Sequence, residues 1–175
     1  NQQGAKLTII GESTISVGDL VLVAKPGSPI KSIKDIKGKK IGYTNPRSTT
    51  QALAFLMLEA AGLKESDVEL VKTGGFGEGL TAVEAGLIDL APVGEPLLAQ
   101  FRNKFQIAIE GRDVLPLLAN VVTVTTEEGL KRPDFLKAVL KARAKAVRWM
   151  YANPDEAAAI VAKSHNMPLD IAKLS

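Results

Sequence analysis

The side chains best suited to ligand chemistry lie in one short polar stretch, TNPRSTT, at residues 44–50. An almost wholly apolar segment, QALAFLMLEAAGL, follows at residues 51–63 and has the spacing of a buried helix. The stretch therefore stands where a helix begins and where backbone N–H groups have no partner within the helix. Its functional groups are one guanidinium and four hydroxyls, on Arg47, Thr44, Ser48, Thr49 and Thr50.

Two interpretations of this helix start are open. Ser48 and Gln51 fit the S-x-x-Q capping box, which is a purely structural role. Alternatively, the free N–H groups and the positive end of the helix dipole would attract a carboxylate, sulfonate, phosphate or nitrate. In that case the hydroxyls add donors, and Arg47 adds a charged fork.

Three further side chains adjoin turns of the same kind. Glu95 follows the apolar segment LIDLAPV and precedes Pro96, so it is either a carboxylate at a helix start or a groove residue for an amino or hydroxyl group. Tyr43 ends a strand-like run, and Phe76 lies in the glycine-rich loop GGFGEG. Either ring could pack on a ligand or in the core. The loop itself lacks the GK[ST] ending of a phosphate-binding loop.

Other kinds of site are disfavoured. The chain has no cysteine and a single histidine, His165, which is a poor ligand set for a metal. No G-x-S-x-G motif is present for a nucleophilic serine. The net charge of +3 comes from scattered basic residues, which argues against nucleic acid as a partner. We therefore expect no catalytic residues, no metal and no cofactor.

The elements that must position these residues alternate between strands and helices. Apolar runs such as LVLVA and NVVTV predict strands that are buried on both faces of a sheet. The predicted strands cover residues 6–10, 19–25, 40–43, 68–72, 88–93, 105–109 and 120–125. This alternation predicts an α/β fold.

The last third of the chain is rich in helix signals. Pro133 begins a predicted long helix to about Tyr151, and Asn153 with Pro154 begins the next. The expected inner face of the long helix is Phe135, Leu136, Val139, Leu140, Ala146, Val147 and Met150. At the N-terminal end, the sequence does not begin with methionine, and a predicted strand starts within a few residues. We expect the chain to be a fragment, or a mature form cut inside a longer protein.

Several motifs occur in an order that resembles one family of transport proteins. They are D-x-x-G-K-x-(I/V)-G from Asp35 to Gly42, G-x-(I/V)-D from Gly86 to Asp89, and the Glu95–Pro96 pair. Together with the serine- and threonine-rich helix start and the C-terminal helices, they resemble the solute-binding proteins of ABC importers. The most similar group is the nitrate/sulfonate/taurine and thiamine-precursor binding family, over about residues 18–175.

The resemblance implies an α/β, type II periplasmic-binding-protein fold, with two α/β lobes joined by crossing strands and ligand in the cleft. Residues 1–26 would be part of the first lobe and a crossing strand, 27–105 the second lobe, and 106–175 the return to the first lobe. The first lobe would then be incomplete in this chain.

The resemblance also implies ligand contacts at Tyr43, Thr44, Ser48, Thr49 and Glu95. Residues 45–47 depart from the pattern, because many relatives have a glycine before the serine, so the ligand class stays open. The implied function is a monomeric, non-enzymatic, extracytoplasmic protein, with or without a lipid anchor, that delivers a small anionic or polar ligand to an ABC permease. The alternatives are an enzyme or biosynthetic protein of the thiamine-pyrimidine type on the same scaffold, and the ligand-sensing domain of a regulator.

Overall fold

A computed structural model describes residues 4–14, 18–114 and 120–174. These residues form two compact units. One unit contains residues 18–114, and the other contains residues 4–14 and 120–174. The lobe boundaries expected near residues 26 and 105 remain a prediction.

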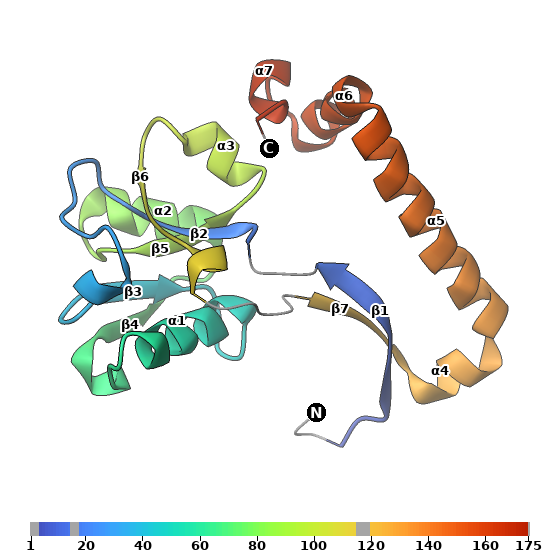
Figure 1. The fold of residues 1–175 in the computed structure, drawn as a ribbon, viewed down its shortest axis with the longest axis horizontal. Helices are drawn as coiled ribbons and strands as arrows, with labels where there is room; N and C mark the ends of the chain where they lie inside the picture. The colour runs from blue at the N-terminus through green and yellow to red at the C-terminus, as the bar shows by residue number, and fades with distance from the viewer. Residues whose placement is uncertain (1–3, 15–17, 115–119, 175) are drawn as a thin grey trace. The chain divides into compact units, whose positions relative to one another are not determined.

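The strands of the first of these units, residues 18–114, form two neighbouring sheets (Figure 1). β2 (Leu20–Ala24) lies between β5 (Ala91–Gly94) and β6 (Gln106–Glu110) and is antiparallel to both. β3 (Lys40–Tyr43) pairs in parallel with β4 (Glu69–Lys72). A parallel bridge between Ile41 and Leu90 joins β3 to the residue before β5, so β3, β4 and β5 point the same way.

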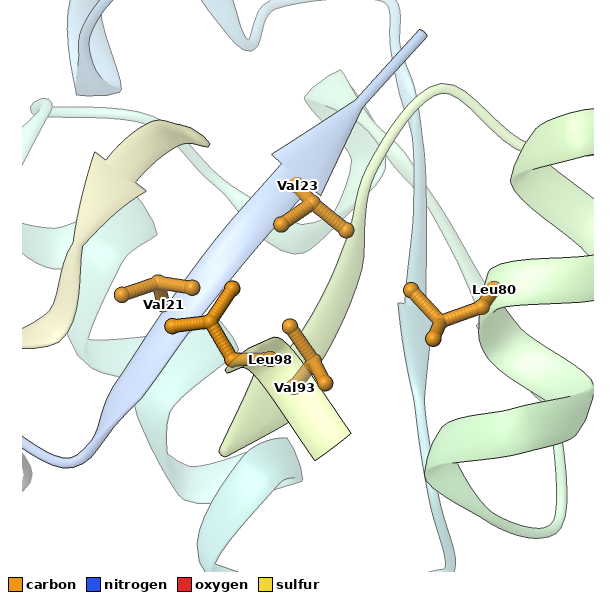
Figure 2. Close-up of a cluster of buried hydrophobic side chains, with 5 residues drawn as sticks. All are labelled: Val21, Val23, Leu80, Val93 and Leu98. Carbon is orange, nitrogen blue, oxygen red and sulfur yellow. The ribbon is translucent and has the colours of Figure 1, made fainter. Parts of the chain in front are cut away.

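The central strand β2 is covered on both faces, as its uninterrupted apolar sequence predicted. All five of its residues are buried. Val21 and Val23 pack with Val93 of β5, Leu80 of α2 (Phe76–Ala85) and Leu98 of α3 (Leu97–Phe101), as Figure 2 shows. Alternate residues of a strand point to opposite faces, so Leu20, Leu22 and Ala24 are buried on the other face.

Two helices of this unit end where their sequences predicted. α1 (Thr49–Ala60) buries Leu53, Ala54, Met57 and Leu58 along one face. Gly62 follows it with φ of 68°, a left-handed conformation that favours glycine. Gly86 has φ of 75° at the end of α2. The short 3-10 helices are η1 (Ile33–Asp35), η2 (Glu65–Asp67) and η3 (Gly111–Asp113).

In the second unit, β1 (Leu7–Thr14) pairs antiparallel with β7 (Asn120–Thr125). Four helices follow: α4 (Thr126–Lys131), α5 (Pro133–Ala152), α6 (Pro154–His165) and α7 (Leu169–Ala172). Ala158 of α6 packs with Met167 and with Ala172 of α7 in a small apolar cluster.

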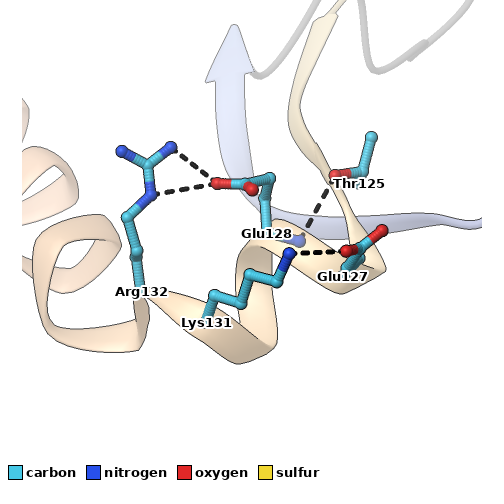
Figure 3. A network of polar contacts seen from close by, with 5 residues as sticks. All are labelled: Thr125, Glu127, Glu128, Lys131 and Arg132. Atoms are coloured by element: carbon cyan, nitrogen blue, oxygen red, sulfur yellow. Dashed lines mark hydrogen bonds and ion pairs between the residues drawn. The ribbon is translucent and has the colours of Figure 1, made fainter.

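The link from β7 through α4 to α5 is fixed by local polar contacts, shown in Figure 3. The Thr125 hydroxyl accepts a hydrogen bond from the Glu128 N–H group and begins α4. Lys131 pairs with Glu127, and Arg132 pairs with Glu128, each one helical turn apart. All four charged side chains are exposed enough that each pair stabilises the helix only weakly.

The expected inner face of α5 is only partly covered. None of its 20 residues is buried, and of the expected face only Leu136 and Leu140 are even half-buried. Asn153 also differs from expectation. It precedes α6 as predicted, but its side-chain amide donates to the Trp149 carbonyl at 2.8 Å and so caps the end of α5.

No helix among the described residues combines the length and the apolarity of a bilayer span.

Candidate functional site

The candidate site lies at one edge of the two sheets of residues 18–114, which the Ile41–Leu90 bridge joins. The parallel strands β3, β4 and β5 end at this edge, and the loops that follow them lead into α1, α2 and α3. The first two loops are tied together: the Gly74 N–H group donates to the Thr44 carbonyl at 2.9 Å, and the Asn45 amide donates to the Gly74 carbonyl at 3.0 Å. In open α/β sheets, the edge at the carboxyl ends of the strands is where ligands bind.

Ser48 caps α1, as its sequence predicted. Its backbone is extended, with φ of −82° and ψ of 163°, and its hydroxyl accepts from the Gln51 N–H group at 3.2 Å. The Gln51 side chain reaches one residue further than in a capping box, because it accepts from the N–H group of Arg47 at 2.6 Å. Arg47 has φ of 65°. This left-handed turn explains why glycine would also suit the position before the serine.

Three hydroxyl groups form a hydrogen-bonded chain centred on Thr50, whose residue is only 6% exposed. The Thr50 hydroxyl accepts from the Thr44 N–H group at 2.9 Å. It also lies 2.9 Å from the Thr44 hydroxyl and 2.8 Å from the Ser48 hydroxyl. This chain fixes the loop before α1 against the first turn of the helix.

The Thr49 hydroxyl stands outside this chain. It makes no hydrogen bond to any described residue, and neither do the N–H groups of Thr49 and Thr50. The Arg47 side chain is exposed and forms no ion pair within the described part of the chain. The start of α1 therefore presents two backbone donors, one hydroxyl donor and one nearby cation.

The aromatic candidates differ in their surroundings. Phe76 is the first residue of α2 and packs against the core cluster of Val21, Val93 and Leu98. Its ring lies at the end of β5, where a Cβ atom added to Gly94 would be 3.8 Å from it. Tyr43 is half-buried at the end of β3, and its hydroxyl makes no hydrogen bond to a described residue.

Glu95 follows β5, and its carboxylate turns toward α3. One oxygen accepts from the Ala99 N–H group at 3.0 Å, and the other lies 3.6 Å from the Arg102 guanidinium. Of the two roles considered for Glu95, these contacts correspond to the structural one, a carboxylate at a helix start. A ligand amine at this position would have to share the carboxylate with these two partners.

Sequence reasoning missed two polar residues at this edge, Asn45 and Thr73. The Thr73 N–H and hydroxyl groups both donate to the Tyr43 carbonyl, at 2.8 and 3.1 Å. A usable signal existed, because Thr73 follows β4 as Thr44 follows β3. His165 is exposed at the end of α6. The described residues contain no group of three or more histidine, aspartate or glutamate side chains placed to hold a metal.

A shallow polar pocket of about 260 Å³ lies at the opposite edge of the sheet, lined in part by Lys25, Ser28, Gly86 and Asp89. It contains none of the predicted ligand residues. The two lowered carboxyl pKa values in this unit also lie away from the candidate site. The Lys31 N–H group, followed by the Ser32 hydroxyl, lowers the pKa of Asp35. The Lys64 N–H group lowers the pKa of Asp67.

Many solved structures resemble the chain, and two of them illustrate the range of the match. The periplasmic aliphatic sulphonate binding protein SsuA from Escherichia coli matches 97% of this chain with a TM-score of 0.85 and 22% identity. The desulfurization enzyme DSZB matches 96% with a TM-score of 0.65 and 17% identity. At these identities the likeness shows the fold, which is the type II periplasmic-binding fold that the family resemblance implied. This chain spans 55% of the first structure and 63% of the second.

A curated relative is the riboflavin-binding protein RibY from Chloroflexus aurantiacus, with 25% identity over 144 residues. The match covers 79% of this chain and 40% of the relative, so the chain spans less than half of that protein. The sequence model of the family described as NMT1/THI5 like matches residues 1–157. This match covers most of the chain, which therefore belongs to the NMT1/THI5-like family.

Proposed function

We propose that this chain is part of an extracytoplasmic solute-binding protein of an ABC importer, and that the start of α1 binds the anionic head of a small organic ligand. One observation carries the proposal: Ser48 caps the helix, yet the Thr49 and Thr50 N–H groups and the Thr49 hydroxyl make no hydrogen bond to any residue that the structure describes. Such donors at a positive helix end favour an anion. Family membership and the fold support the same function.

The residues of the candidate site would have three roles: donating hydrogen bonds to the ligand, holding those donors in place, and flanking the rest of the ligand. Thr49 and the first amides of α1 would donate to the ligand oxygens, and Arg47 would add a charge-assisted hydrogen bond. Ser48, Thr44 and Thr50 would hold these donors in place through their hydroxyl chain. Tyr43 and Phe76 would flank the organic part of the ligand, and Glu95 would contact a polar substituent.

The ligand class follows from these donors. A sulfonate, nitrate or carboxylate satisfies several N–H and O–H donors at once, whereas a neutral ring satisfies fewer. The printed names of the relatives cover both kinds, an aliphatic sulphonate for SsuA and riboflavin for RibY. We favour the anionic class. The complete protein would act as a monomer, close its two lobes over the ligand by hinge motion, and deliver it to permease subunits.

Calorimetric titration of the complete gene product, freed of co-purified ligand, tests the proposal. Taurine, ethanesulfonate, nitrate and riboflavin would serve as probes. We expect Thr49→Val to weaken binding of the preferred anion about tenfold or more, since a hydrogen bond to a charged group contributes about 1.5–3 kcal/mol. Thr81→Val is the matched control, because Thr81 is an exposed α2 residue whose hydroxyl bonds to the Gly77 carbonyl.

Two results would contradict the proposal. Equal affinities of the Thr49 and Thr81 variants for the ligand would show that it does not bind at the start of α1. Failure of every probe to bind would count against anion capture itself. Because DSZB is an enzyme on a similar fold, each probe is also incubated with the protein and analysed by mass spectrometry. Turnover would favour an enzyme over a transport protein.

A further inference from the structure

Two loops of the candidate site leave the sheets next to each other, where β3 and β4 end. At first their backbones continue the parallel pairing of these strands. The Thr73 N–H group donates to the Tyr43 carbonyl at 2.8 Å. The Gly74 N–H group then donates to the Thr44 carbonyl at 2.9 Å. Among the described residues the backbone pairing ends there, because one loop turns into α1 and the other into α2. The next link is made by a side chain, since the Asn45 amide donates to the Gly74 carbonyl at 3.0 Å.

The glycine-rich loop, residues 74–79, has few restraints of its own. Four of its six residues are glycine, which leaves the backbone more freedom than any other residue type. Packing holds the loop at Phe76, whose ring lies against the core cluster that includes Val93. At Gly74 the Asn45 amide is the only side chain among the described residues that forms a hydrogen bond. Asn45 therefore helps to fix the end of the loop that core packing does not hold.

The effect of this link is local. Asn45 is exposed, and its side chain makes this one hydrogen bond within the described part of the chain. Gly74 is exposed as well, so loss of the amide would leave no buried polar group without a partner. An exposed hydrogen bond between neutral groups contributes little to the stability of the whole fold. What it can set is the position of one loop against the other.

We propose that Asn45 is a positioning residue that makes the candidate site selective for anions carrying an organic group. The inference rests on the proposed function, in which the start of α1 binds the anionic head and Phe76 flanks the organic part. An inorganic anion such as nitrate contacts the start of α1 alone and needs no fixed second loop. An organic anion contacts both loops, so it binds more tightly when the glycine-rich loop is held in place before binding.

Hydrogen exchange resolved to single amides, measured on the complete gene product without ligand, tests the link itself. Asn45→Ala removes the side-chain amide. Asn103→Ala is the matched control, because Asn103 is an exposed asparagine before β6 whose side chain makes no hydrogen bond to a described residue. We expect the Gly74 amide to exchange about three- to tenfold faster in Asn45→Ala, as the usual net contribution of a hydrogen bond predicts, and the β2 amides to be unchanged. An unchanged Gly74 amide would overturn the proposal.

Calorimetric titration of the same proteins with ethanesulfonate and nitrate tests the selectivity. We expect Asn45→Ala to bind ethanesulfonate about three- to tenfold more weakly, and to change the affinity for nitrate by less than about twofold. Asn103→Ala should match the unsubstituted protein with both anions. If nitrate does not bind, methanesulfonate, which has a shorter organic group, takes its place.

Three results of the titration would overturn the proposal. Equal losses for both anions would mean that Asn45 acts on the anion itself. An unchanged affinity for ethanesulfonate, or binding of nitrate alone, would mean that the glycine-rich loop does not contact the ligand. Failure of every anion to bind would refute the proposed function and, with it, the selectivity. The exchange rate of the Gly74 amide would still decide whether Asn45 holds the loop.

Discussion

The hydroxyl of Thr50 can be removed with little change in shape by Thr50→Val. In the structure this hydroxyl accepts from the Thr44 N–H group and bonds to the Thr44 and Ser48 hydroxyls. The last two groups lie on half-buried residues, so we expect water to replace their lost partner. The Thr44 N–H group, which points toward the buried Thr50, would lose its only partner among the described residues.

The expected cost follows from that unpaired donor. A buried donor without a partner costs about 1–3 kcal/mol, which corresponds to a rise of about 5- to 150-fold in the unfolding equilibrium constant. Urea titration followed by circular dichroism would show a lower midpoint with an unchanged slope. Hydrogen exchange by NMR would show faster exchange of the Thr44 amide in particular.

Thr50→Ser is the matched control, because it keeps the hydroxyl and removes only a methyl group. We expect it to cost no more than about 1 kcal/mol and to keep the Thr44 amide protected. The reasoning fails if Thr50→Val leaves both the urea midpoint and the protection of the Thr44 amide unchanged. It also fails if Thr50→Ser is as damaging as Thr50→Val, since the methyl group and not the hydroxyl would then stabilise the loop.

Three further predictions concern local features of the same unit, and urea denaturation tests each of them. Ser48→Ala removes the cap of α1 and should lower the free energy of unfolding by about 1 kcal/mol; an unchanged midpoint would mean that water replaces the cap. Gly86→Ala should cost about 1 kcal/mol because φ is 75° there, whereas Gly77→Ala in α2, which meets no atom within 4 Å, should be neutral or stabilising. The pKa of Asp35 is lowered by the Lys31 N–H group, so its stabilisation is present above the unfolded pKa of about 3.8 and is lost as pH falls through the folded value. Asp35→Asn should therefore flatten the pH dependence of the free energy of unfolding below about pH 4. The same decrease below about pH 4 in the variant and in the unsubstituted protein would refute this.

The local features were predictable from sequence because they depend on neighbouring residues. The strands at Lys40–Tyr43 and Asn120–Thr125 have the predicted bounds. Ser48 caps α1, and Gly86 ends α2. A cap needs only a short polar side chain next to free N–H groups, and a left-handed turn needs only a residue without a side chain.

The partners of the candidate residues were decided by tertiary structure. Glu95 could be placed at a helix start from its sequence. Its hydrogen bond from the Ala99 N–H group and its ion pair with Arg102 depend on the path of α3. Phe76 could be placed beside a glycine-rich turn, but only the path of α2 sets its half-buried ring against the core cluster at the end of β5. The sequence leaves such a side chain with two possible sets of partners. The positions of the neighbouring helices and strands decide which set it contacts.

The sequence by itself determined an α/β chain with a capped, donor-rich helix start after its third strand. Only the tertiary structure decided that β2 lies between β5 and β6, and that Thr50 joins the hydroxyls of Thr44 and Ser48 into one chain. It also decided that Leu136 and Leu140 are half-buried while the rest of the expected inner face of α5 is exposed. The reason is physical: capping and turns are set by contacts a few residues apart, whereas strand order and burial depend on residues that are distant in sequence.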